Sequence, residues 1–228
     1  MKRMFILLTL IYTTTIARAD LVLQQQIVAA NYTGIATVKV KGAKVRLDLY
    51  AGQPQAISTI SDLSTGDSVT LMHNQKMFVK TSGALMKQAK SSGSGVASKA
   101  PIPHPTGKTE KVGAYNTDIY TWSNSRGITG TAWVAKNYPD YAKIRADLAV
   151  VDQSAAVMNN GADPELSRLP GMVVKTQVTG GSQTIIVTLV SAQEEPVDAS
   201  LFQTPANYKE LSRPKPFVNQ TPQKALGK

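Results

Sequence analysis

Residues Gly127–Pro170 read GITGTAWVAKNYPDYAKIRADLAVVDQSAAVMNNGADPELSRLP and combine a strand pattern with the clearest helical period of the chain. The first part, Ile128–Lys136, has the composition of a β-strand. After Asp140, which follows a proline, apolar residues recur at spacings of three and four, and this period places them on one face of a helix. They are Tyr141, Ile144, Leu148, Val151, Ala155 and Met158. The turn sequence Asn159–Gly161 is expected to end the helix.

Most of the remaining sequence has β or loop character, so this helix has no helical partner. Its apolar face is therefore expected to pack on a sheet. The pattern predicts a mainly β (α+β) fold with one major helix: a large curved antiparallel sheet capped by the helix on its concave side. The expected strands are 21–30, 34–41, 43–50, 56–63, 68–73, 76–81, 112–122, 128–136, 172–178 and 183–191.

The strand at 43–50 alternates most cleanly. Val45, Leu47 and Leu49 fall on one face, and Arg46 and Asp48 fall on the other. A period of two with one polar face predicts a half-buried antiparallel strand whose polar side chains face water. In the hairpin around Asn74, the same alternation predicts that the apolar residues of one strand face those of the other. The expected pairs place Val69 and Leu71 opposite Met77 and Val79.

The first 19 residues have the features of a secretory signal peptide. A basic start precedes an apolar run, and Ala17–Ala19 fits the small-x-small cleavage pattern, which makes Asp20 the expected mature start. The apolar run is shorter than the ~20 residues that span a membrane. The sequence therefore predicts a soluble exported protein, either periplasmic or extracellular.

The mature chain is expected to form a single domain over residues 20–211. Residues 86–110 are rich in Ser, Gly, Pro and Lys and cannot bury much apolar surface. This insert is expected to be either a mobile flap over one sheet face or a disordered insertion. Residues 212–228 are rich in Pro and Lys without any period, and we expect them to form a disordered tail.

Composition restricts the classes of partner. The chain has no cysteine, which excludes disulfides, thiolate metal sites and the lipid-attachment cysteine of a bacterial lipoprotein. Loss of the signal peptide lowers Lys+Arg from 25 to 22 against 15 Asp+Glu, which leaves a net charge of +7. Such a surface can meet an acidic protein or an anionic membrane surface. The few aromatic residues do not alternate with a basic run, so nucleic acid is not an expected partner. We expect a monomer.

The sequence contains no recognisable set of catalytic or metal-binding residues. His73 and His104 are the only histidines, and neither has an evident neighbour to orient its ring. Glu194 and Glu195 are adjacent on an expected extended segment, so their side chains point to opposite sides. A G-x-S-x-G nucleophile motif and a phosphate-binding loop are both absent. The sequence therefore predicts a non-enzyme without metal or cofactor.

Binding is the remaining kind of function. A curved sheet capped by a helix encloses an apolar groove where the helix leaves the inner face uncovered. The same inner-face residues would serve as core and as ligand contacts. The candidates are Val45, Leu47, Leu49, Val69, Leu71, Met77, Val79, Trp133, Ile144, Leu148 and Val151.

Five segments, in order, carry a family resemblance: KVRLDLY, HNQKMFVK, GAYNTDIYTW, TAWVAKNYPDY and SLFQTPANYKEL. Together they resemble a family of secreted bacterial proteins of unknown function over about Leu21 to Leu211. That family in turn is similar to the periplasmic lipoprotein-carrier (LolA/LolB-like) superfamily. The most specific pieces are Trp133–Lys136 and the pattern Phe202-x-x-Pro205-x-x-Tyr208. Asn207 stands where the family usually has glycine, and asparagine tolerates the left-handed backbone of such a turn.

The resemblance implies an unclosed β-barrel, a helical lid and an apolar groove that holds acyl chains. We therefore expect a non-enzymatic exported binding protein that holds a lipid or another amphiphile between sheet and helix. The alternative is an envelope-associated protein-interaction module whose interior is filled by its own side chains. A cavity of roughly a few hundred cubic ångströms favours the first.

Overall fold

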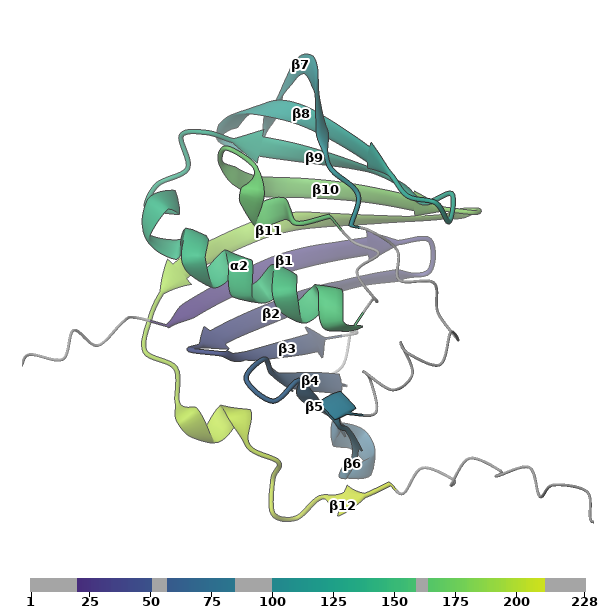
Figure 1. Ribbon diagram of the computed structural model, residues 1–228, viewed down its shortest axis with the longest axis vertical. Helices are drawn as coiled ribbons and strands as arrows, with labels where there is room; N and C mark the ends of the chain where they lie inside the picture. Colours follow the sequence, from purple (N-terminus) through teal and green to yellow (C-terminus); the bar gives the residue numbers. More distant parts are fainter. Residues whose placement is uncertain (1–19, 51–56, 85–99, 159–163, 212–228) are drawn as a thin grey trace, which may run out of the picture.

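The computed structural model describes residues 20–50, 57–84, 100–158 and 164–211 (Figure 1). The expected signal peptide, the helix stop, most of the 86–110 insert and the 212–228 tail lie outside these residues. The strands are β1 (Leu21–Ala29), β2 (Tyr32–Lys41), β3 (Lys44–Tyr50), β4 (Ile57–Asp62), β5 (Asp67–Met72), β6 (Met77–Thr81), β7 (His104–Val112), β8 (Tyr115–Ser123), β9 (Thr129–Ala135), β10 (Met172–Gly180), β11 (Gln183–Glu194) and β12 (Lys209–Glu210). The helical elements are α2 (Tyr141–Met158) and the 3₁₀ turns η1 (His73–Gln75), η2 (Leu166–Arg168) and η3 (Ala199–Phe202).

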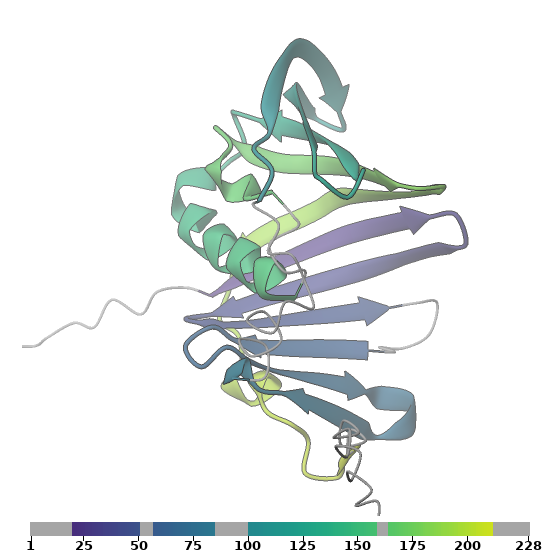
Figure 2. The same cartoon turned by 45° about the vertical axis from the view of Figure 1, so that its right-hand side comes forward.

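All twelve strands belong to one sheet, in the order β12-β6-β5-β4-β3-β2-β1-β11-β10-β9-β8-β7. Figure 2 shows the strands fanning from β7 at the top to β6 at the bottom. Every described pair is antiparallel except β12 with β6, which is parallel. Within the described residues β7 and β12 end the order without pairing to each other, so the sheet is open. The expected fold class, mainly β with one major helix and an unclosed antiparallel sheet, is confirmed.

Helix α2 lies across the middle strands of the sheet, as its single apolar face requires (Figure 1). The face of the sheet that it covers, called the helix face below, holds the largest buried cluster. That cluster comprises Leu21, Leu23, Val38, Val40, Val45, Trp133, Ala135, Ile144, Met172 and Val174. Among the described helices, none combines the length and the apolar run that crossing a bilayer demands.

The opposite face of β1–β6 is also buried, because the C-terminal segment 196–211 packs on it. Val197 and Phe202 of this segment join Val22, Ile60, Leu71 and Phe78 in a second buried cluster. Val22 lies between Leu21 and Leu23 in β1, so adjacent residues of one strand enter different clusters. The expectation that the polar face of β3 meets water is wrong. Arg46 and Asp48 are 6% and 1% exposed, because the C-terminal segment covers them.

The register of β5 and β6 differs by one residue from the expected one. Leu71 pairs with Phe78, and Thr70 pairs with Val79. Because side chains alternate between faces, this shift separates the two sets that were expected to face each other. Val69 and Leu71 belong to the face covered by the C-terminal segment, whereas Met77 and Val79 belong to the helix face.

Part of the expected insert is a strand. Residues 104–110 belong to β7, which pairs with β8 and leaves its own side chains exposed. The strand expected from Val112 to Trp122 is therefore interrupted by a turn, where Gly113 has a φ of +56° that glycine adopts without strain. An exposed edge strand has no apolar alternation to mark it, which is why the polar sequence of β7 resembled a loop.

The C-terminal segment is part of the hydrophobic core, and we expect Phe202→Ala to show this. Phe202 is 7% exposed, and truncating a buried phenylalanine costs about 3–5 kcal/mol. The measurement is the free energy of unfolding in urea. Leu211→Ala, at a residue 44% exposed, is the control and should stay within about 0.5 kcal/mol of the parent. Equal stability of the two variants would show that the segment does not contribute to the core.

Candidate functional site

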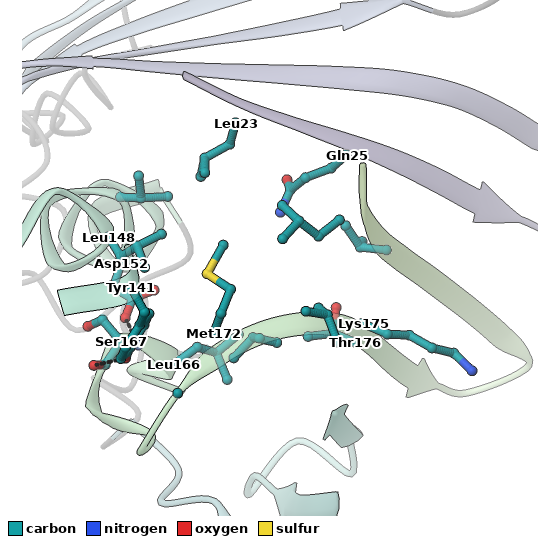
Figure 3. A pocket seen from close by; sticks show the side chains of 16 residues that line it. Leu23, Gln25, Tyr141, Leu148, Asp152, Leu166, Ser167, Met172, Lys175 and Thr176 are labelled. Atoms are coloured by element: carbon teal, nitrogen blue, oxygen red, sulfur yellow. Dashed lines mark hydrogen bonds between the residues drawn. The ribbon is translucent and has the colours of Figure 1, made fainter. Parts of the chain in front are cut away.

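A cavity of about 250 Å³ lies between α2, η2 and strands β1, β10 and β11 (Figure 3). Its wall is mostly aliphatic, with a few polar groups. The lining residues are Leu23, Gln25, Tyr141, Leu148, Val151, Asp152, Leu166, Ser167, Gly171, Met172, Val173, Val174, Lys175, Thr176, Val187 and Leu189. An apolar hollow with a small number of polar side chains is the usual form of a site for a small apolar ligand.

Hydrogen bonds to two side chains of α2, Asp152 and Tyr141, hold η2 against the helix and so fix one wall of the cavity. The backbone N–H of Ser167 donates to a carboxylate oxygen of Asp152 at 2.7 Å. The hydroxyl of Tyr141 donates to the carbonyl of Leu169 at 3.0 Å. Both side chains come from the inward side of α2, so the helix carries the wall with it.

Irregular strand pairing widens the floor of the cavity. The register of β10 against β9 shifts between Val173 and Lys175, and that of β1 against β11 shifts between Gln24 and Gln25. A bulge adds an unpaired residue and turns neighbouring side chains away from strict alternation. This explains why five consecutive residues of β10, from Met172 to Thr176, all reach the cavity.

The charged and polar groups of the lining differ in where they point. Figure 3 shows Gln25 directed into the cavity, whereas the ammonium of Lys175 extends away from it. That ammonium lies 4.2 Å from the centre of the Trp133 ring, in a cation–π contact. The indole N–H of Trp133 donates to Glu110 at 2.8 Å. Lys175 is therefore engaged outside the cavity.

The eleven groove candidates divide into four groups. Leu148 and Val151 line the cavity. Val45, Trp133 and Ile144 are buried in the cluster under α2, and Leu47 packs against that cluster. Leu49, Met77 and Val79 are half-buried on strands β3 and β6 and do not line the cavity. Val69 and Leu71 lie on the opposite face of the sheet, beneath the C-terminal segment, because of the register described above.

A second, polar cluster lies between the opposite face of the sheet and the C-terminal segment. Asp48 accepts hydrogen bonds from Lys39 at 2.7 Å, Arg46 at 2.6 Å and the hydroxyl of Ser58 at 2.6 Å. Arg46 also donates to the carbonyl of Leu201 at 2.5 Å. The network thus connects strands β2, β3 and β4 to η3.

His73 extends this polar network to the end of the segment. Its Nε2 lies 2.7 Å from the Ser58 hydroxyl, and its Nδ1 lies 2.7 Å from the Tyr208 hydroxyl. Because Ser58 donates its only proton to Asp48, Nε2 carries the histidine proton and donates to Ser58. Nδ1 then accepts from Tyr208. The expectation that no neighbour orients His73 is wrong, since both ring nitrogens have partners.

The surroundings shift two pKa values in this cluster. Burial lowers the pKa of His73, and the nearby positive charge of Arg46 lowers it further, against the opposing effect of Asp48. Burial acts to raise the pKa of Asp48, but the hydrogen bonds from Lys39, Ser58 and Arg46 outweigh it and hold that pKa below its ordinary value. The surroundings therefore favour the neutral form of His73 and the ionised form of Asp48.

This polar cluster has the residue types of a hydrolase but not the arrangement. A nucleophilic serine passes its proton to a histidine that an acid orients. Here Ser58 is fully buried and donates to the acid, while a tyrosine orients the histidine. Within the described ranges, no group of three or more His, Cys, Asp or Glu side chains is placed to hold a metal ion. The cluster fastens the C-terminal segment to the sheet.

Most of the cavity lining was not among the sequence candidates. It comes from β1, β10, β11 and η2, whereas the candidates came mainly from β3, β5 and β6. One signal was present: Val187 and Leu189 belong to a strand that is apolar on both faces, as expected of a strand in the covered centre of a sheet. Which side of α2 the cavity occupies depends on bulges that leave no mark in the sequence.

Fold and site together define an open antiparallel sheet that carries a helix, with a small apolar cavity between the two. The chain belongs to the DUF4412 family, a domain of unknown function, whose model matches residues 22–208. The expected resemblance to a family of unknown function is thereby confirmed. No curated protein matches the chain.

The chain is also similar to solved structures. An uncharacterized conserved protein from Thermus thermophilus has a TM-score of 0.53 at 7% identity, covering 86% of this chain and 92% of that one. PNGF-II has a TM-score of 0.41 at 14% identity, covering 85% and 31%. The Mycobacterium tuberculosis lipoprotein LppX has a TM-score of 0.40 at 11% identity, covering 80% and 90%. The first likeness supports the fold alone, and the other two are too low to carry an argument.

The stability of the protein is expected to fall on acidification through protonation of His73. The folded protein binds this proton less tightly than the unfolded chain, whose histidine has the ordinary pKa of 6.5. The stabilisation is thus present above pH 6.5 and is lost as the pH falls through the folded-state value. The measurement is urea unfolding from neutral pH to about pH 5.

The comparison for this experiment uses two histidine variants. His73→Gln keeps a donor near Ser58 and should flatten the pH dependence over that range. His104→Gln, at an exposed position of β7, should leave it unchanged. An identical pH profile in the parent and His73→Gln would contradict the assignment.

Proposed function

We propose that this protein is a non-enzymatic exported binding protein that holds a lipid or another amphiphile in the cavity between α2 and the sheet. The carrying observation is the cavity itself, about 250 Å³ and lined chiefly by aliphatic side chains of α2, β1, β10 and β11. A protein interior is normally packed to crystal density with few voids larger than a water molecule. A mainly aliphatic hollow beneath the only long helix of the described chain is the kind of site that a small apolar ligand fills.

The position of the cavity also supports binding. Its wall at η2 is hydrogen-bonded to side chains of α2, so the helix and this wall would move together, and their displacement from β1 and β11 would open the site. The resemblance to the lipoprotein-carrier superfamily fits the same use of a helix over an open sheet, but as a fold-level analogy it adds little weight.

The alternative, an envelope-associated interaction module, requires an interior filled by its own side chains. The cavity counts against that hypothesis. The polar cluster on the opposite face also leaves little surface there for a partner, because the chain's own C-terminal segment occupies it. Export rests on the signal-peptide pattern of residues 1–19 and is tested by sequencing the N-terminus of protein from its host, which should begin at Asp20.

The first test of binding is native mass spectrometry of protein purified from the envelope of its host, followed by organic extraction. We expect a co-purifying lipid in near-stoichiometric amount. Binding of a fluorescent single-chain lipid to the stripped protein gives the dissociation constant. The proposal would be contradicted if the protein had the mass of the ligand-free chain and did not bind the fluorescent probe.

Filling the cavity should abolish binding without unfolding the protein. Val187→Phe on β11 adds volume where the lining has space, and we expect at least a tenfold weaker affinity, or about 1.4 kcal/mol. Val190→Phe is the matched control, since Val190 is on the same strand, 58% exposed and outside the lining. Circular dichroism should show both variants folded. Equal affinities of the two variants would place the ligand elsewhere.

A further inference from the structure

We propose that the cavity selects a single alkyl chain ending in an uncharged, hydrogen-bonding head group, such as an alcohol, an ester or an amide, over the corresponding fatty-acid anion. This inference rests on the proposed function and goes further, because it assigns the chemical class of the ligand and the residue that recognises its head group. Three observations carry it: the size of the cavity, the placement of its charges and the direction of one glutamine.

The volume restricts the ligand to one chain. Cavities for drug-sized ligands span about 300–1,000 Å³, and this one, at about 250 Å³, lies just below that range. Apolar side chains from α2, η2, β1, β10 and β11 line it, including Leu148 of α2, Met172 of β10 and Leu189 of β11. The walls therefore favour a single unbranched hydrocarbon chain, and a second chain of equal length would have to remain outside.

The charges near the cavity disfavour an anion. The lining contains two ionic side chains, Asp152 and Lys175. The Asp152 carboxylate faces Ser167 at the η2 wall, so an anionic head group would meet a like charge there. The Lys175 ammonium extends away from the cavity and lies over the Trp133 ring (Figure 3). Any hydration that a carboxylate loses here is not offset by a cation of the lining, and desolvating a charge costs far more than burying a hydrogen-bonded neutral group.

The long-range field of the protein acts in the other direction but weakly. The mature chain carries an expected net charge of +7, which attracts anions in general. At physiological salt this attraction is largely screened beyond about 8 Å. The groups inside the cavity therefore decide the preference once the ligand has entered.

Gln25 provides the matching polar contact. Its side-chain amide projects into the cavity (Figure 3) and, among the described residues, has no hydrogen-bond partner. Gln24 and Gln26 on either side are exposed, so β1 turns one glutamine of three toward the cavity. An amide both donates and accepts. A hydroxyl, ester or amide head group can therefore pair with it, and a bare hydrocarbon cannot.

The test is competition against a fluorescent single-chain lipid by four ligands of equal chain length at neutral pH. They are the alkyl alcohol, the monoacylglycerol, the fatty acid and the alkyltrimethylammonium ion. We expect both neutral ligands to bind at least tenfold more tightly than the fatty acid. Gln25→Leu should weaken the neutral ligands about tenfold and remove most of this preference. Gln26→Leu, one position along on the opposite face of β1, should change neither.

The outcomes separate this inference from the proposed function. If none of the four ligands competes and the probe does not bind, both fail. If the fatty acid binds as tightly as the neutral ligands, or the cation binds most tightly, the head-group assignment fails while carriage of a single chain stands. If Gln25→Leu and Gln26→Leu have the same affinities for the four ligands, Gln25 does not bind the head group and the assignment is overturned.

Discussion

The pairing of β1 with β11 is the contact on which the rest of the structure depends. Strands β2–β6 follow one another as antiparallel neighbours, and so do β7–β11, but only β1 against β11 joins these two halves into one sheet. The pair runs from Leu21 opposite Glu194 to Ala29 opposite Ile185. It brings together residues far apart in the chain, and closing such a long loop costs conformational entropy. Burial on both faces of β1 offsets that cost, because Leu21 and Leu23 enter the cluster under α2 while Val22 enters the cluster under the C-terminal segment.

The cavity is a consequence of the same pairing. β1 and β11 supply part of its floor, and a bulge between them sits at Gln25, where the lining changes from aliphatic to polar. On the neighbouring side, the bulge of β10 exposes consecutive residues to the same space. A helix laid on a regular sheet would be expected to pack without a gap. Here Asp152 and Tyr141 tie α2 to the η2 turn, which holds the helix over the irregular strands beside the cavity.

The sequence predicted what depends on local order and missed what depends on distant partners. The period of α2 and the alternation of the strands predicted the helix and the large antiparallel sheet, and the family resemblance implied that the sheet is open. Alternation shows that two faces differ, but not that both are covered, so Arg46 and Asp48 were assigned to solvent although residues 196–211 bury them. The predicted β5–β6 register was wrong by one residue. It therefore assigned Val69 and Leu71 to the helix face, although they lie on the face that the C-terminal segment covers. The cavity was expected under α2, and two of its residues were named, but its floor depends on bulges that no periodicity records.

The two faces of the sheet are held by different kinds of interaction. A buried ion pair seldom stabilises more than well-packed apolar residues would, and its value lies in fixing one arrangement. The network from Lys39 to Tyr208 does this for the C-terminal segment, since each donor meets one acceptor and a shift of one residue would leave charges buried without partners. The helix face has the reverse character. Its buried cluster is mainly aliphatic and its contacts are non-directional, although α2 also buries the polar residues Asp147 and Ser154. One face of the sheet thus carries a directional polar attachment, and the other carries a mainly aliphatic cluster with a cavity beside the helix.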